Sequence, residues 1–160
     1  MDTQELRALD RDVLWHPFTQ MHGWQQEDAP IIARAEGTTL YDTDGNAYID
    51  GTSSLWCNVH GHAHPVIDAA VREQLGRVAH TTMLGQSHPG AIELGRRLVE
   101  IAPAGLSRVF YSDNGSTAVE IALKMAFQWW RQGGDTTRRA YVYLDHSYHG
   151  DTIGSVSVGG

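Results

Sequence analysis

The chain has 160 residues, of which 41% are hydrophobic and 19% charged, and its formal net charge is −7 with histidine neutral. This balance is typical of a globular protein and excludes a disordered tail. The negative charge argues against binding nucleic acid through its phosphates, because such binding needs clustered Lys and Arg.

The apolar runs are short and the start of the chain is polar, which argues against a membrane or an export role. No run approaches the roughly 20 apolar residues that a spanning helix needs. Residues 1–12 are polar and acidic, unlike the basic and then apolar start of a signal peptide. The single cysteine, Cys57, forms no internal disulfide, so we expect a cytoplasmic location.

The first half of the sequence predicts one helix, a small group of strands and an unusual loop. Residues 3–14 have amphipathic helical spacing, and Pro17 then disfavours helix. Residues 31–50 predict short strands around a tight turn at 42–46, where Asp, Gly and Asn favour turn conformations. The loop 51–64 carries Leu, Trp, Cys and three His, and loops with such side chains often have a function.

The second half predicts further helices and a strand–helix–strand unit. Pro65 and Pro89 stand where helices are expected to begin. Residues 108–112 and 140–144 predict buried strands, joined by a helix over 117–130. This order indicates a right-handed βαβ crossover in a parallel sheet, and therefore the α/β class.

The predicted sheet is unfinished, because two strands and one crossover do not complete a doubly wound domain. Residues 156–160 carry no stop signal for a domain. The simplest interpretation is a truncated chain or a fragment of a longer one. We expect poor solubility of this chain by itself, since an open sheet edge and apolar faces would be exposed.

The loop at 112–118 has the composition of an anion site at a helix start. Gly115 lets the backbone approach a ligand closely, and the N–H groups of Gly115, Ser116 and Thr117 would point at an anion. The hydroxyls of Ser116 and Thr117 would add donors. The same residues also fit an ordinary helix N-cap. Neither a Walker loop nor a dinucleotide glycine motif is present, which argues against a nucleotide site.

Tyr148 follows the second predicted strand. In open α/β sheets the loops after the carboxyl ends of strands line the ligand crevice. Tyr148 could therefore stack on a flat cofactor near an anion held at Gly115 and Ser116, and the alternative is a packed surface tyrosine.

Three other features favour structural interpretations. His60, His62 and His64 suggest a metal site, but their spacing is not that of a helical pair and no familiar fourth ligand completes the set. Cys57 is expected to be a small buried residue, because nothing marks it as a low-pKa thiol. Lys124, the only lysine, lies mid-helix about two turns beyond the anion loop, so its side chain should extend to the surface.

Five segments together resemble the class III aminotransferases, over a match from about residue 10 to the end. They are WHPFTQM at 15–21, DGTSSLW at 50–56, HGH at 60–62 with Pro65, SDNGSTAVE at 112–120 and YHGDT at 148–152. The last two are common to the class. The first two are more specific and are similar to the branch that aminates 8-amino-7-oxononanoate to 7,8-diaminononanoate in biotin synthesis.

The resemblance implies the fold-type I architecture of pyridoxal-phosphate-dependent transferases. Residues 1–62 would be an N-terminal segment and small-domain strands with a pocket loop, and 63–160 the first, incomplete part of the cofactor-binding large domain. The backbone N–H groups of Gly115 and Ser116 would hold the phosphate of pyridoxal 5′-phosphate (PLP). Tyr148 would stack beside its ring and touch the substrate.

The resemblance also implies that Phe18, Leu55 and Trp56 line the substrate pocket. Many members have Tyr at the position of Phe18 and Trp at that of Leu55, and that Tyr helps to receive S-adenosylmethionine as amino donor. Members with Phe and an aliphatic residue there resemble this chain more closely, and some use lysine. Our hypothesis is a lysine or other non-standard donor.

Three parts of a working site lie beyond residue 160 in the family pattern: the Schiff-base lysine, the aspartate beside the pyridine nitrogen and the arginine for the substrate carboxylate. We therefore assign no catalytic residue to this chain, and expect it to be inactive alone and a homodimer at full length. Two alternatives stay open. One is a sister class III enzyme acting on another ω-amino compound, and the other is a non-catalytic fragment or dimerisation module.

Overall fold

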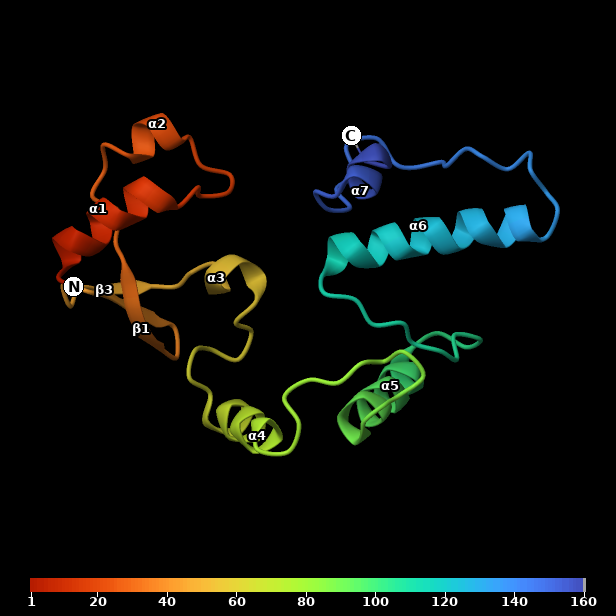
Figure 1. Ribbon diagram of the computed structural model, residues 1–160, viewed down its shortest axis with the longest axis horizontal. Coiled ribbons are helices and arrows are strands. Elements are labelled where there is room, and N and C mark those ends of the chain that lie inside the picture. The colour runs from red at the N-terminus through yellow and green to blue at the C-terminus, as the bar shows by residue number, and fades with distance from the viewer. Residues whose placement is uncertain (160) are drawn as a thin grey trace. The chain divides into compact units, whose positions relative to one another are not determined.

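The computed structural model describes residues 1–159 of the chain (Figure 1). The chain divides into two compact units, one over Met1–Thr81 and one from Thr82 onward, and each is described by itself. The predicted boundary at residue 62 concerns the domains of the whole family fold and stays a prediction. Within the described residues, no helix combines the length and the apolar character that crossing a membrane requires.

Two short helices open the first unit. Helix α1 (Thr3–Val13) begins with a capping box, in which the Asp2 carboxylate accepts from the Glu5 N–H and the Glu5 carboxylate accepts from the Asp2 N–H, each at 2.9 Å. Helix α2 (Met21–Trp24) is capped by Gln20, whose side chain accepts from the Gly23 N–H. The predicted helix over 3–14 is therefore confirmed to within one residue.

Three antiparallel strands in the order β1-β2-β3 form the only sheet of the described residues. They are β1 (Ile32–Glu36), β2 (Thr39–Asp42) and β3 (Ala47–Ile49). In the register, Leu40 pairs with Ala35 on one side and with Tyr48 on the other. The predicted strands around a turn at 42–46 are confirmed.

The turn between β2 and β3 is organised by Asp42, a buried residue that is 5% exposed. Its carboxylate accepts from the N–H groups of Asp44 and Asn46, at 3.0 and 2.8 Å. It also accepts from the Asn46 side-chain amide at 2.9 Å and from the Tyr48 hydroxyl at 2.8 Å. These donors stabilise the charged form, so the pKa of Asp42 is lowered to about 2, with the Asn46 side chain as the largest cause.

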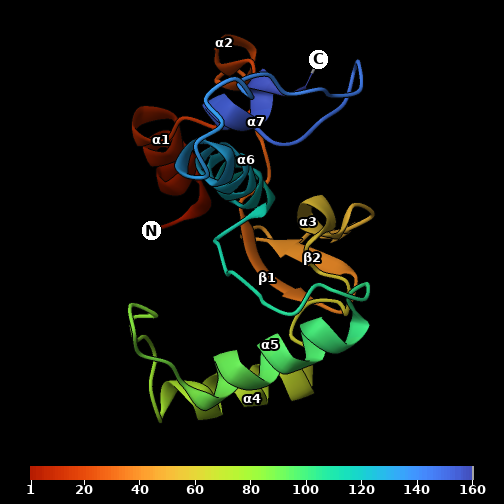
Figure 2. The same ribbon diagram turned by 90° about the vertical axis from the view of Figure 1, so that its right-hand side faces the viewer.

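The first unit continues through α3 (Ser53–Trp56) to α4 (Pro65–Leu75). Pro65 occupies the first turn of α4 as expected, where the missing N–H of proline has no helical acceptor. The second unit contains α5 (Pro89–Ile101), α6 (Gly115–Gln132) and α7 (Ile153–Ser157). Helix α7 lies beside the first turns of α6 (Figures 1 and 2).

The strands predicted at 108–112 and 140–144 are wrong, because both segments are irregular in the structure. Their apolar side chains are open to solvent, with Phe110 68%, Val142 102% and Leu144 81% exposed. A strand exists only where another backbone pairs with it, and no described segment pairs with either. The predicted βαβ crossover is therefore not formed within residues 1–159. No apolar side chain of these residues is buried.

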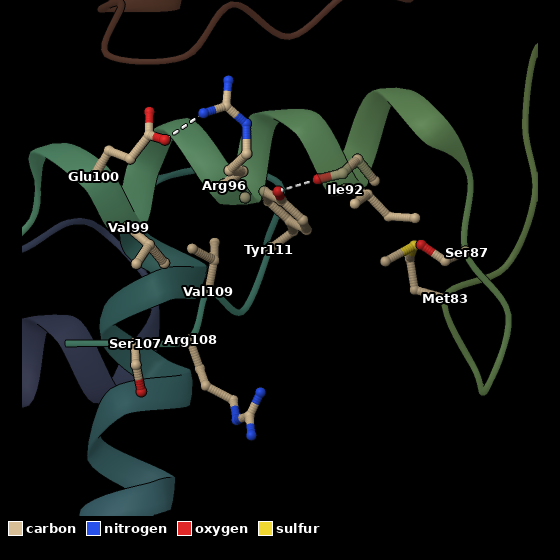
Figure 3. Close-up of a pocket in the computed structure, with 12 residues that line it drawn as sticks. Met83, Ser87, Ile92, Arg96, Val99, Glu100, Ser107, Arg108, Val109 and Tyr111 are labelled. Atoms are coloured by element: carbon tan, nitrogen blue, oxygen red, sulfur yellow. Dashed lines mark hydrogen bonds and ion pairs between the residues drawn. The ribbon is translucent and has the colours of Figure 1, made fainter.

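Helix α5 packs on residues 107–111 around an open pocket of about 530 Å³ (Figure 3). The Tyr111 hydroxyl donates to the Ala91 carbonyl at 2.7 Å, and a Cβ on Gly95 would lie 3.0 Å from that hydroxyl. The lining is mostly apolar, and its charged members are Arg108 and the ion pair of Arg96 with Glu100. It has the character of a packing contact and shares no residue with the sites described below.

The turn at Asp42 generates a pH prediction. Because the folded-state pKa lies below the ordinary aspartate value of 3.8, the stabilisation by Asp42 is present above about pH 4 and is lost as the pH falls towards about 2. A carbon-13 NMR titration of the Asp42 carboxyl should give a pKa of about 2. Asn46→Ala should raise it more than Tyr48→Phe, because the Asn46 amide is the larger cause. A pKa of 3.8 in the unsubstituted protein would show that these hydrogen bonds are absent.

Candidate functional site

The start of α6 presents two backbone donors without partners. The Asn114 side chain accepts from the Thr117 N–H at 2.9 Å, and the Asn114 carbonyl accepts from the Ala118 N–H at 3.0 Å. The N–H groups of Gly115 and Ser116 make no hydrogen bond with any described residue. Together with the partial positive charge at a helix N-terminus, they can receive an anion such as a phosphate.

The hydroxyls at this helix start are engaged within the protein, contrary to the expectation that they add phosphate donors. The Ser116 hydroxyl lies 3.0 Å from that of Thr152 and 3.2 Å from that of Ser155, and it accepts from the Thr152 N–H at 3.0 Å. The Thr117 hydroxyl exchanges hydrogen bonds with the Asn114 backbone. The available donors are therefore backbone N–H groups.

Helix α7 and the loop before it are tied to α6 by further polar contacts. Ser155 is fully buried, and its hydroxyl donates to the Ser116 carbonyl at 3.0 Å. The Glu120 carboxylate accepts from the Gly154 N–H at 2.6 Å. Gly150, at φ +114°, lies so close that an added Cβ would come within 2.8 Å of the Ser116 Cα. Only glycine fits here without a backbone shift.

Tyr148 projects from this loop. Its side chain is 71% exposed, and its hydroxyl donates to the Asp151 carboxylate at 2.6 Å. That hydrogen bond raises the pKa of Tyr148, because it favours the protonated phenol. The loop and α7 border a hollow of about 170 Å³, which Ser147 also lines. The Ser147 hydroxyl is buried and has no hydrogen-bond partner among the described residues.

The structure thus brings Gly115, Ser116 and Tyr148 to one end of the second unit. The residues expected to line the substrate pocket all lie in the first unit, with Phe18 90%, Leu55 65% and Trp56 77% exposed.

The loop that carries Leu55 and Trp56 has an unusual backbone. Residues Ser53, Ser54, Leu55 and Trp56 have φ of 51°, 47°, 66° and 70°, and none of them is glycine. A left-handed conformation costs about 1–2 kcal/mol per residue for L-amino acids. The Asp50 carboxylate offsets this strain by accepting from the Ser54 N–H and hydroxyl, both at 2.8 Å, and by contacting His62. Nothing in the sequence predicts this turn beyond an Asp four residues before a Ser.

The three histidines at 60, 62 and 64 make separate contacts in the structure. His62 Nε2 lies 2.7 Å from the Asp50 carboxylate, while His60 and His64 meet edge to face at 6.0 Å. No group of three or more His, Cys, Asp or Glu in residues 1–159 could hold an ion. Cys57 is exposed, which corrects the prediction that it is buried, because no described element covers the end of the left-handed turn.

Lys124 is exposed on α6, as predicted. It lies nine residues after Gly115, which is roughly 13 Å along the axis of a helix that rises about 1.5 Å per residue. It lines a different pocket, together with Glu120 and Tyr141.

Residues 22–160 match the family model described as Aminotransferase class-III. The chain belongs to the class III aminotransferases. It is 60% identical over 160 residues to the adenosylmethionine-8-amino-7-oxononanoate aminotransferase of Nitratidesulfovibrio vulgaris, covering 99% of this chain and 30% of that protein. It is 51% identical to the protein of the same name from Aquifex aeolicus, covering 100% of this chain and 35% of the relative.

Solved structures agree with this assignment. The adenosylmethionine-8-amino-7-oxononanoate aminotransferase of Methanocaldococcus jannaschii superposes with a TM-score of 0.95 at 42% identity, covering 99% of this chain and 36% of that one. An omega transaminase of Pseudomonas jessenii, solved in complex with PMP, gives 0.90 at 29% identity, covering 97% and 34%. The chain thus spans about a third of its relatives' length. The prediction of an α/β, fold-type I transferase portion is confirmed.

The close approach of Gly150 to Ser116 yields a stability prediction. Gly150→Ala should lower the thermal unfolding midpoint and expose the Thr152 N–H to hydrogen exchange, because the new Cβ displaces the loop. Gly105→Ala is the matched control, since Gly105 has φ +96° but nothing within 4 Å. It should cost only the left-handed penalty of about 1–2 kcal/mol. Equal effects of the two substitutions would contradict the contact.

Proposed function

We propose that the protein containing this chain is a PLP-dependent aminotransferase that converts 8-amino-7-oxononanoate to 7,8-diaminononanoate in biotin synthesis, with S-adenosylmethionine or lysine as amino donor. Support comes from the identity of 42% to 60% that relatives with this name have across nearly the whole chain. The observation that carries the proposal is the pair of free N–H groups at Gly115 and Ser116, at the end of α6 where the loop that carries the exposed Tyr148 contacts Ser116.

The residues present fit the phosphate end of this cofactor. Gly115 and Ser116 would bind phosphate oxygens through their N–H groups, with the helix dipole adding attraction. Tyr148 would lie against the ring, with its hydroxyl oriented by Asp151. When bound, PLP supplies the electron sink for the transfer of an amino group.

Phe18, Leu55 and Trp56 would line the substrate pocket. All three are exposed in the first unit, which leaves them free to contact a ligand. 8-Amino-7-oxononanoate carries a run of methylene groups, and apolar side chains are suited to contact such a chain. The covalent anchor, the aspartate beside the pyridine nitrogen and the arginine for the substrate carboxylate would come from the remaining two-thirds of the protein, which we propose to be a cytoplasmic homodimer.

For the amino donor we propose lysine or another non-standard compound. Phe18 has no phenol to donate a hydrogen bond to a polar donor molecule, and Leu55 offers a smaller stacking surface than a Trp. The relatives' names give adenosylmethionine as their substrate, so this chain would differ from them in the donor and agree in the acceptor. The second candidate function is another ω-transamination, because omega transaminases are among the structural neighbours at 27% to 32% identity.

A half-reaction with the full-length enzyme tests both parts of the proposal. Lysine should change the absorbance of bound PLP rapidly and S-adenosylmethionine slowly, and 8-amino-7-oxononanoate should then reverse the change. Rapid reaction with S-adenosylmethionine and none with lysine would refute the donor assignment. Failure of 8-amino-7-oxononanoate to reverse the change, with reversal by another keto compound, would favour the second candidate function.

The position of Lys124 gives a separate prediction. In the full-length enzyme, borohydride should fix PLP covalently to a lysine outside residues 1–160, and peptide mapping by mass spectrometry locates it. Lys124→Arg should leave both the fixation and the turnover unchanged, because Lys124 lies roughly 13 Å along α6 from the phosphate site. Recovery of the cofactor on a peptide containing Lys124 would overturn this placement.

A further inference from the structure

The left-handed turn at 53–56 needs support from outside itself. At Ser54 and Leu55 the φ/ψ pairs are 47°/51° and 66°/55°, which is left-handed helical space. Two local hydrogen bonds close the turn, from the Trp56 N–H to the Thr52 carbonyl at 2.8 Å and from the Cys57 N–H to the Ser53 carbonyl at 2.9 Å. No apolar core covers it, since Leu55 and Trp56 are both exposed. Strain of this kind persists only where the surroundings fix the backbone, and it is often found at ligand sites.

Asp50 supplies that support with both of its carboxylate oxygens. Its Oδ1 accepts from the Ser54 N–H at 2.8 Å, and its Oδ2 lies 2.8 Å from the Ser54 hydroxyl and 2.7 Å from His62 Nε2. The Asp50 side chain is only 5% exposed. The pKa of Asp50 is lowered, first by the Ser54 N–H and then by His62, which agrees with a carboxylate that acts as an ionised acceptor.

His62 connects Asp50 to the sheet. Its backbone forms an antiparallel bridge with Gly37, donating to the Gly37 carbonyl at 2.8 Å and accepting from the Gly37 N–H at 3.0 Å. The neighbouring Gly61, at φ +79°, allows this approach, because a Cβ there would lie 3.0 Å from the Gly37 carbonyl oxygen. A continuous set of hydrogen bonds therefore runs from the β1–β2 turn through His62 and Asp50 to Ser54.

We infer that Asp50 and His62 are positioning residues that set the place of Leu55 and Trp56, and through them the affinity for the amino acceptor. This inference rests on the proposed function, because it takes Leu55 and Trp56 as substrate contacts. Neither residue of the pair touches the substrate. They act by holding a strained backbone, so their loss should weaken substrate binding more than it slows the chemical step.

The test compares His62→Phe with His62→Gln in the full-length enzyme. Phenylalanine keeps a ring but cannot donate a hydrogen bond to Asp50. Glutamine can donate one, because its amide nitrogen is separated from Cβ by the same number of bonds as Nε2 of histidine. His62→Phe should raise KM for 8-amino-7-oxononanoate roughly tenfold while kcat changes less than about threefold, because a small misplacement of contact residues weakens binding. His62→Gln should restore KM to near that of the unsubstituted enzyme.

Asp50→Asn is the second variant and should also raise KM, because an amide cannot accept from three donors. His22→Gln, an exposed histidine in α2 without a side-chain hydrogen bond, is the control and should leave KM unchanged. The inference is overturned if His62→Phe and His62→Gln have the same KM, or if the variants lose active protein with KM unaltered. If the unsubstituted enzyme does not aminate 8-amino-7-oxononanoate, the proposed function fails. The positioning role is then tested by comparing the KM of the same variants for the keto compound that the enzyme does accept.

Discussion

The arrangement of the loop 148–152 against α6 in the second unit requires glycine at position 150, because a side chain there would collide with Ser116. Because nothing projects from that residue, the loop lies directly on Ser116, and the Thr152 N–H reaches the Ser116 hydroxyl. The contact occupies the Ser116 hydroxyl and leaves the N–H groups of Gly115 and Ser116 free. It also places Tyr148, four residues before Thr152, at the same end of the unit. A steric condition at one glycine therefore brings the N–H donors that we propose for the phosphate to the same end of the unit as the ring that we propose for stacking.

In the first unit, a loop is held in place by a charged side chain. A left-handed turn of non-glycine residues is held by the two oxygens of Asp50, which His62 connects to the sheet. In both units the loops expected to meet ligand are fixed by short-range polar contacts. No apolar side chain of residues 1–159 is buried, so the local site geometry does not depend on a core within this part of the chain.

The sequence predicted the features that are decided locally. Helices α1 and α6 follow from their apolar spacing and from caps at Asp2 and Asn114, and the β2–β3 turn follows from the residues at 42–46. The segment 140–144 shows what the sequence alone does not predict. Its composition favours extended backbone, but strand formation requires a pairing segment that composition does not name. The left-handed turn at 53–56 is not predicted by the sequence, because it contains no glycine. It depends instead on the hydrogen bonds of Asp50 with Ser54 and His62, which a sequence pattern does not indicate.

The proposed function requires that the N–H groups of Gly115 and Ser116 bind the phosphate of PLP. The most direct measurement is the amide chemical shift of these two residues in the selectively nitrogen-15-labelled full-length protein during titration with PLP. We expect saturable shifts of both amides, reproduced in part by inorganic phosphate, and little change at Thr117, whose N–H is already bonded to Asn114. Saturation of the cofactor absorbance with both amides unmoved would contradict it.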